Sequence, residues 1–293
     1  AASDVYKRQA GTSYTRLKTT LDYGKETTRG KSELTNNIDN KTKGLDKDYA
    51  TQWSYGVAES MTLLIPNFHG GSSMSSVLSI DDSQTLDFLR KFRNKKLANA
   101  LQFKSGSYWG EQPIVSGPTY VGAIVIFLFI LGLLLVKNEL RIWILLATIM
   151  SLMLAWGKNF MPLTDFFLDY FPGYNKFRAV SMILVIAEFT IPLLAFIGLN
   201  KFLSSNSKFE DLKKLKIAFY TAGGITLIFA LFPTMFLDFL SEKDLTPISS
   251  GVKTPDGFLD GLIADRSTLL QSDAWRSFLY ILLSFGVLFA FIR

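Results

Sequence analysis

The residues best suited to chemistry lie in a connector between two strongly apolar segments, residues 157–178. It places the cations Lys158, Lys176 and Arg178 and the carboxylates Asp165 and Asp169 among seven aromatic side chains. Aromatic rings favour the membrane–water interface because part of each ring system is apolar and part can meet water. We therefore expect this connector to lie on a bilayer surface.

Proline and glycine limit the helix that this connector can form. Pro162, Pro172 and Gly173 leave one or two turns around residues 163–170, with Asp165 and Asp169 four residues apart on one face. Two carboxylates beside basic residues could bind or activate a polar headgroup. They could equally form a solvated face that neutralises neighbouring charge, and the sequence leaves both interpretations open.

Composition defines the class of protein. The 293 residues are 48% hydrophobic and 14% aromatic with only 19% charged, which is typical of an integral membrane protein. The absence of cysteine excludes disulfides, thiolate metal sites and cysteine nucleophiles. His69 is the only histidine, which excludes the usual multi-histidine zinc sites. A carboxylate-only site would suit Mg²⁺, Mn²⁺ or Ca²⁺.

The first nine residues differ from the rest of the chain. Residues 4–9, DVYKRQ, can be encoded by an adapter end used in sequencing libraries, so we expect residues 1–9 to be a sequencing artefact. The natural sequence would then begin in mid-gene near Ala10. An apolar run that stops at Arg293 also predicts a fragment.

Residues 10–118 are polar and contain no run long enough to span a bilayer. Fourteen Lys and Arg against eleven Asp and Glu is a modest excess, which argues against nucleic-acid binding. We expect mostly helices and loops here, with β-compatible patches over 12–35, a helix over 48–64 and an amphipathic helix over 83–103. The last of these is either an interfacial helix that touches anionic headgroups or a solvated basic face. Residues 70–73, GGSS, are more typical of a turn than of a phosphate loop.

The rest of the chain, 119–293, predicts an all-α polytopic membrane domain. Five apolar segments are each close to the length that crosses a hydrocarbon core of about 30 Å. These predicted spans are 119–136, 140–156, 179–199, 217–236 and 277–292.

Basic residues predict the orientation. Residues 137–141 and 200–216 carry seven Lys and Arg within 22 positions, whereas 157–178 and 234–276 carry seven within 65. The positive-inside rule places the first pair in the cytoplasm. Residues 10–118, 157–178 and 234–276 are then extracytoplasmic.

Glu188 is an intramembrane candidate near the middle of the third predicted span, one turn before Pro192. A carboxylate at that depth is costly unless it is paired, protonated or facing a polar cavity, so it is a candidate for function. Alternatively, a hydroxyl of Thr148 or Ser151 on the neighbouring span holds it in place.

Four long blocks resemble the bacterial YfhO membrane proteins, especially those of Bacteroidetes-type bacteria. They occur in the same order, and the resemblance runs from about Tyr14 to the end of the chain. The blocks are ATQWSYGVAESMTLLIPNFHGGSS, YWGEQPIVSGPTYVGA, AWGKNFMPLTDFFLDYFPGYNKFRAVSMILVIAEF and ADRSTLLQSDAWRS.

The resemblance implies the GT-C architecture. It also implies sugar transfer from a polyprenyl-phosphate donor to envelope polymers at the outer face of the cytoplasmic membrane. The best-understood catalytic carboxylate of such enzymes lies in the first external loop, which would be upstream of this chain. Donor or lipid-phosphate contacts would then come from Lys158, Lys176 and Arg178. The candidates for a catalytic base or a divalent-cation ligand are Asp165, Asp169 and Glu111.

Two other classes of function remain open. One is a transporter or flippase of a lipid-linked sugar with Glu188 in its path, and the other is a non-catalytic membrane scaffold. Paired half-repeats would favour a transporter, and the five predicted spans show none.

Overall fold

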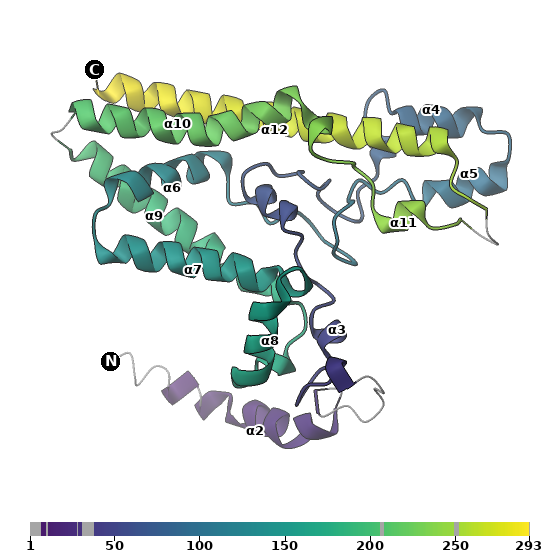
Figure 1. Cartoon of the computed structure of the whole chain (residues 1–293), viewed down its shortest axis with the longest axis horizontal. Helices are drawn as coiled ribbons and strands as arrows, with labels where there is room; N and C mark the ends of the chain where they lie inside the picture. Colours follow the sequence, from purple (N-terminus) through teal and green to yellow (C-terminus); the bar gives the residue numbers. More distant parts are fainter. Residues whose placement is uncertain are drawn as a thin grey trace. The chain divides into compact units, whose positions relative to one another are not determined.

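The computed structural model describes residues 7–9, 11–27, 29–30, 38–205, 208–248 and 252–292, and within these it contains helices and loops without a β-strand (Figure 1). One isolated antiparallel bridge joins Ser76 to Gly106. The chain forms two compact units, residues 1–55 with 153–182 and residues 56–152 with 183–293. The all-helical fold class expected from the sequence is thus confirmed for the described residues.

The first unit contains α2 (Tyr14–Tyr23), α3 (Lys47–Ala50) and α8 (Met161–Tyr170). Its small core consists of Leu45, Ala50 and Leu168, with Tyr174 packed against them. The β-compatible interpretation of 12–35 is wrong over its first half, because α2 continues into a 3₁₀ turn at Gly24–Glu26. Residues 28 and 31–37 lie outside the described residues, as do residues 1–6 of the expected artefact.

Helix α8 is the short helix predicted within the connector. Pro162 lies in its first turn, where no backbone donor is needed. The helix ends at Tyr170, since Phe171 is extended ahead of Pro172. Gly173 follows in the left-handed region at φ 80°.

The helix predicted over 48–64 is wrong, because it is interrupted after α3. Two backbone N–H groups there do not bond to the carbonyl four residues earlier, as they would in a helix. Tyr55 N–H donates to the carbonyl of Ala155, and Gly56 N–H donates to the Glu59 carboxylate. A separate 3₁₀ helix, Ala58–Leu63, follows. The other short 3₁₀ elements are Ile38–Asn40, Val77–Ser79, Gly157–Phe160, Tyr174–Lys176, Val180–Leu184 and Pro233–Met235.

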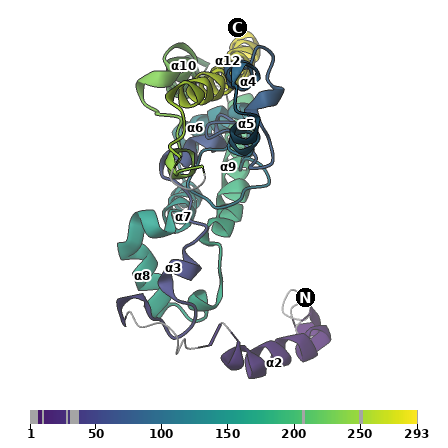
Figure 2. The ribbon, with the colours of Figure 1, turned by 90° about the vertical axis from the view of Figure 1, so that its right-hand side faces the viewer.

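The second unit contains most of the apolar helices. They are α6 (Ala123–Leu135), α7 (Glu139–Ala155, whose last residues belong to the first unit), α9 (Val185–Leu203), α10 (Lys208–Leu231) and α12 (Asp256–Ile292). Helix α6 packs against α9 and α10, and α10 lies side by side with α12 (Figures 1 and 2). The α6–α9 crossing is close because Gly132 and Gly198 face each other, and a Cβ on either would clash with the other helix.

In the described part of the chain, three helical segments are long and apolar enough to cross a membrane: Val180–Leu203, Phe209–Leu231 and Asp256–Ile292. Helix α7 reaches this length only as a broken span together with Gly157–Tyr170. Helix α6 has 13 residues, or about 20 Å, which is short of the hydrocarbon core. The described residues therefore support three spans, or four with the broken pair, whereas the sequence predicted five.

These three segments leave much of their apolar surface uncovered by the protein itself. Only 39%, 33% and 17% of the residues in their most apolar windows are buried by the protein itself. Large side chains stay exposed along them, including Phe189, Phe196, Tyr220 and Val287. Patches of this extent are unfavourable in water, so these helices suit a membrane-embedded protein.

Helix α12 is a single helix of 37 residues, and it begins 21 residues before the predicted span 277–292 (277 − 256 = 21). No proline interrupts the segment. Its polar first half packs against α4 (Gln84–Lys91). The amphipathic helix predicted over 83–103 is also split, because the Asn94 side chain accepts from Leu97 N–H and begins α5 (Lys95–Gln102). The short α11 (Glu242–Leu245) lies in the loop before α12.

Candidate functional site

Arg178 is held by an aromatic cradle in the first unit. Its guanidinium carbon lies 4.8 Å from the ring centroid of Tyr49 and 4.3 Å from that of Trp53. One terminal nitrogen also donates to the Tyr49 hydroxyl. Stacking on two rings fixes the plane of the guanidinium, and the side chain remains exposed. The N–H groups at its edge are therefore oriented before any anion arrives.

The other two predicted phosphate ligands have different environments. Lys176 donates to the backbone carbonyls of Arg29 and Lys43, each at 2.7 Å, so its ammonium ties together segments distant in sequence. Lys158 is exposed, and its backbone N–H donates to the Ser54 hydroxyl at 2.8 Å. Lys176 thus has a structural contact that the sequence did not suggest, and Arg178 is the ligand candidate that the geometry favours.

The two carboxylates of α8 lie beside one cation. Asp165 forms an ion pair with Lys47 at 2.7 Å, and Asp169 adds a favourable charge interaction with the same ammonium. The hydrogen bond to Asp165 is the main reason why the pKa of Lys47 is raised. Asp165 and Asp169 therefore share a face of α8, as predicted, and there they neutralise the charge of Lys47. The third predicted carboxylate, Glu111, belongs to the second unit.

Glu111 lies beside a buried carboxylate that the sequence analysis missed. Glu59 is 2% exposed, accepts from the Tyr108 hydroxyl at 2.6 Å and accepts from Gly56 N–H at 2.7 Å. Burial raises the pKa of Glu59, and the nearby charge of Glu111 raises it further. Burial and the Glu59 charge also raise the pKa of Tyr108. A buried carboxyl group with a raised pKa, such as Glu59, can hold a proton and donate it. In the sequence, Glu59 could have been noticed as the one carboxylate in the apolar run VAESMTLLI.

Glu188 lies in the first turn of α9, nearer one end of the segment Val180–Leu203 than the predicted middle. Its side chain is exposed. The two hydroxyls expected to hold it have other partners: Thr148 bonds to Thr190 at 2.7 Å, and Ser151 donates to the carbonyl of Ile183 at 2.7 Å. These hydrogen bonds between α7 and the segment Val180–Leu203 therefore do not involve Glu188.

The described residues contain no group of three or more carboxylates or imidazoles placed to hold a metal ion. The glycine pair at Gly70 and Gly71 forms a turn, with φ values of 86° and 78°. A Cβ on Gly70 would collide with the backbone of Ser107, so packing accounts for this glycine.

Comparison of the chain with protein-family models, with curated proteins and with solved structures found no match.

Proposed function

We propose that the protein binds the phosphate of a polyprenyl-linked sugar at Arg178 and acts in sugar transfer at the outer face of the bacterial cytoplasmic membrane. The observation that supports the proposal is the aromatic cradle, in which an exposed guanidinium is fixed two residues before the membrane segment Val180–Leu203. A lipid phosphate lies at that depth of a bilayer, just outside the hydrocarbon core. The resemblance to YfhO proteins and their GT-C architecture supports the same assignment.

The geometry of Arg178 supports the proposed role. A guanidinium donates two parallel N–H bonds to a phosphate, and the Tyr49 and Trp53 rings keep that fork from rotating away. In sugar transfer the leaving phosphate gains negative charge as the glycosidic bond breaks, so a fixed cation stabilises the transition state. An envelope polymer is the proposed acceptor. The base that deprotonates its hydroxyl is not assigned to a residue of this chain.

Replacing Arg178 with lysine should weaken binding of farnesyl phosphate by about ten- to a hundredfold, because the charge remains and the two-bond fork is lost. The measurement is a titration of the detergent-solubilised chain with farnesyl phosphate. Arg90→Lys is the matched control, since Arg90 is an exposed arginine on α4, 3.7 Å from Asp87, and its replacement should leave the affinity unchanged.

Equal affinities for the parent and Arg178→Lys would refute the phosphate site. The resemblance implies a catalytic carboxylate upstream of this chain, so the enzymatic part of the proposal is tested in the full-length parent protein, as transfer of radiolabelled sugar from polyprenyl phosphate in membranes. Binding without transfer by that full-length protein would argue instead for a carrier or flippase.

A further inference from the structure

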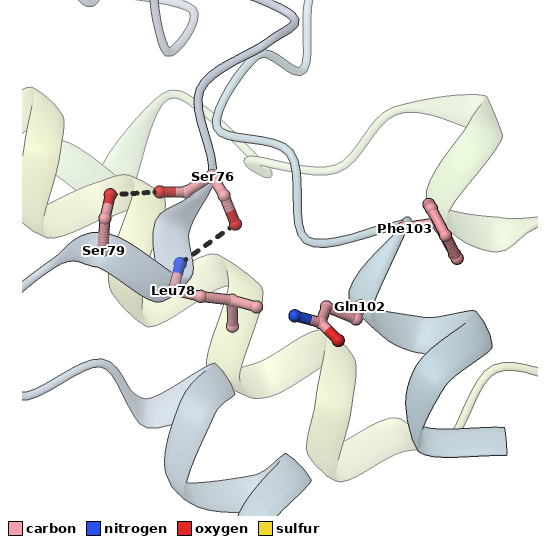
Figure 3. Close-up of a pocket in the computed structure, with 5 residues that line it drawn as sticks. All are labelled: Ser76, Leu78, Ser79, Gln102 and Phe103. Atoms are coloured by element: carbon pink, nitrogen blue, oxygen red, sulfur yellow. Dashed lines mark hydrogen bonds between the residues drawn. The ribbon is translucent and has the colours of Figure 1, made fainter. Parts of the chain in front are cut away.

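A hollow lies in the second unit between residues 76–79 and the end of α5 (Figure 3). Its volume is about 590 Å³, within the range of small-molecule sites. The residues that line it are Ser76, Leu78, Ser79, Gln102 and Phe103.

The wall of this hollow is fixed by hydrogen bonds. Val77 N–H donates to the carbonyl of Ser105, and the Ser76 hydroxyl donates to the same carbonyl at 2.9 Å. The Ser79 hydroxyl donates to the carbonyl of Ser76 at 2.8 Å. The Ser76 oxygen also accepts from Leu78 N–H at 3.2 Å, so Ser79 is the serine whose oxygen is left to accept from a ligand. Beneath the wall, Val77 and Leu101 are completely buried.

Phe103 is the unusual member of the set, because its side chain is 93% exposed. Leaving a phenylalanine ring in water is unfavourable, and a ligand that packs on its flat face would remove that apolar surface from water. Gln102, next to it, is exposed, and its amide makes no hydrogen bond to any residue in the described part of the chain. Figure 3 shows both side chains at the end of α5, with the Gln102 amide directed towards Leu78.

The absence of charged side chains from the lining of the hollow indicates that its ligand is uncharged. None of its lining residues is ionisable. The nearest cation along the chain, Lys104, is directed elsewhere: its ammonium donates to the carbonyls of Lys243 and Thr246. An anion would therefore find no free cation among these residues. A lipid chain would be a poor occupant because of the two hydroxyls and the carboxamide.

We propose that this hollow binds a neutral saccharide. The weakly positive C–H groups on one face of a pyranose ring pack on the negative face of the Phe103 ring. The sugar hydroxyls exchange hydrogen bonds with the Gln102 amide, which both donates and accepts, and donate to the Ser79 oxygen. This assignment is independent of the phosphate site, because it uses other residues in the other unit.

The test is saturation-transfer NMR of the detergent-solubilised chain with cellobiose and with the disaccharide of N-acetylglucosamine. At least one disaccharide should receive saturation from the protein. Phe103→Ala should weaken its binding about tenfold or more, whereas Phe103→Trp, which keeps an aromatic face, should retain it. Gln102→Ala should weaken it a few-fold.

Met74→Ala is the matched control, since Met74 is 86% exposed on the segment leading to this wall and does not line the hollow. Circular dichroism checks that every variant keeps its helical content. Absence of transfer to both disaccharides, or undiminished transfer in Phe103→Ala, would overturn the saccharide site. Loss of farnesyl phosphate binding in Arg178→Lys would leave this result unchanged, so the two proposals fail separately.

Discussion

Replacing Arg266 with methionine should lower the free energy of unfolding by about 3 to 5 kcal/mol, because it breaks a fully buried ion pair. The Arg266 side chain is 1% exposed, and it donates to the Asp244 carboxylate at 2.7 Å. Its other N–H groups bond to the carbonyls of Phe239 and Gly106, each at 2.8 Å. Methionine fills a similar space and leaves a buried carboxylate and two carbonyls without these donors.

The matched control is Arg276→Met on the same helix. Arg276 pairs with Asp273 at the same 2.7 Å, and Asp273 is as buried as Asp244, but the Arg276 side chain is 59% exposed. Asp273 also keeps the Asn67 amide as a donor at 2.6 Å, so the expected loss is smaller, about 1 to 2 kcal/mol. Unfolding in detergent with increasing denaturant measures both changes. The double variant Arg266→Met with Asp244→Leu should recover part of the loss, because the stranded charge is gone. Equal losses for the two arginines would show that burial does not control the effect.

Lowering the pH from 7.5 to 4.5 should cost the folded state about 3 kcal/mol through His69 alone. Its ring is buried, 4.1 Å from the Trp109 ring centroid, and burial lowers the pKa of the imidazole from about 6.5 to about 3. The unfolded chain therefore binds the proton more tightly than the folded chain does. Stability from this group is complete above pH 6.5 and is lost as the pH falls towards 3.

The contribution of His69 is isolated by comparing the parent with His69→Leu. No other histidine is present, so the variant removes the only imidazole. Glu59 acts in the opposite direction, since its raised pKa favours the folded state as the pH falls, but it is present in both proteins. The unfolding free energy of His69→Leu should therefore fall less between pH 7.5 and 4.5, by about 3 kcal/mol. Identical pH dependence in the two proteins would mean that His69 is not buried as described.

The class of the protein and the local geometry of α8 could be predicted because both depend on neighbouring residues. Apolar runs indicate a membrane directly, and a spacing of four puts Asp165 and Asp169 on one face. Pro162 and Pro172 set the limits of that helix. These features need no knowledge of the rest of the chain.

The features that the sequence analysis missed depend on distant contacts. Lys176 reaches carbonyls 147 and 133 residues away, and the Arg178 cradle comes from Tyr49 and Trp53, which fall within the single helix predicted over 48–64. Glu59 depends on Tyr108, 49 residues further on. Hydrophobic periodicity cannot report such pairings, because it carries no information about which segments meet.

The continuity of α12 was missed for another reason. Its polar first half contains Asp265, which accepts from the Ser83 hydroxyl and from the backbone N–H groups of Gln84 and Thr85. A carboxylate that caps α4 is satisfied within the fold, so the helix can carry it without a break. From the sequence alone, Asp265 is one of the acidic residues of the segment 234–276, which is predicted to be an extracytoplasmic loop ahead of the last span.

Labelling of single cysteines on either side of Val180–Leu203 tests the membrane account most directly. The chain has no native cysteine, and the two positions, Phe177 and Ser204, are both exposed. Phe177→Cys and Ser204→Cys are each expressed in bacteria and treated as spheroplasts with a membrane-impermeant maleimide. We expect the cysteine at 177, beside Arg178, to be labelled at once and the cysteine at 204 to be labelled only after the membrane is permeabilised. Labelling of both in intact spheroplasts would contradict the span, and the reverse pattern would place Arg178 in the cytoplasm, away from the outer-face donor that we propose it binds.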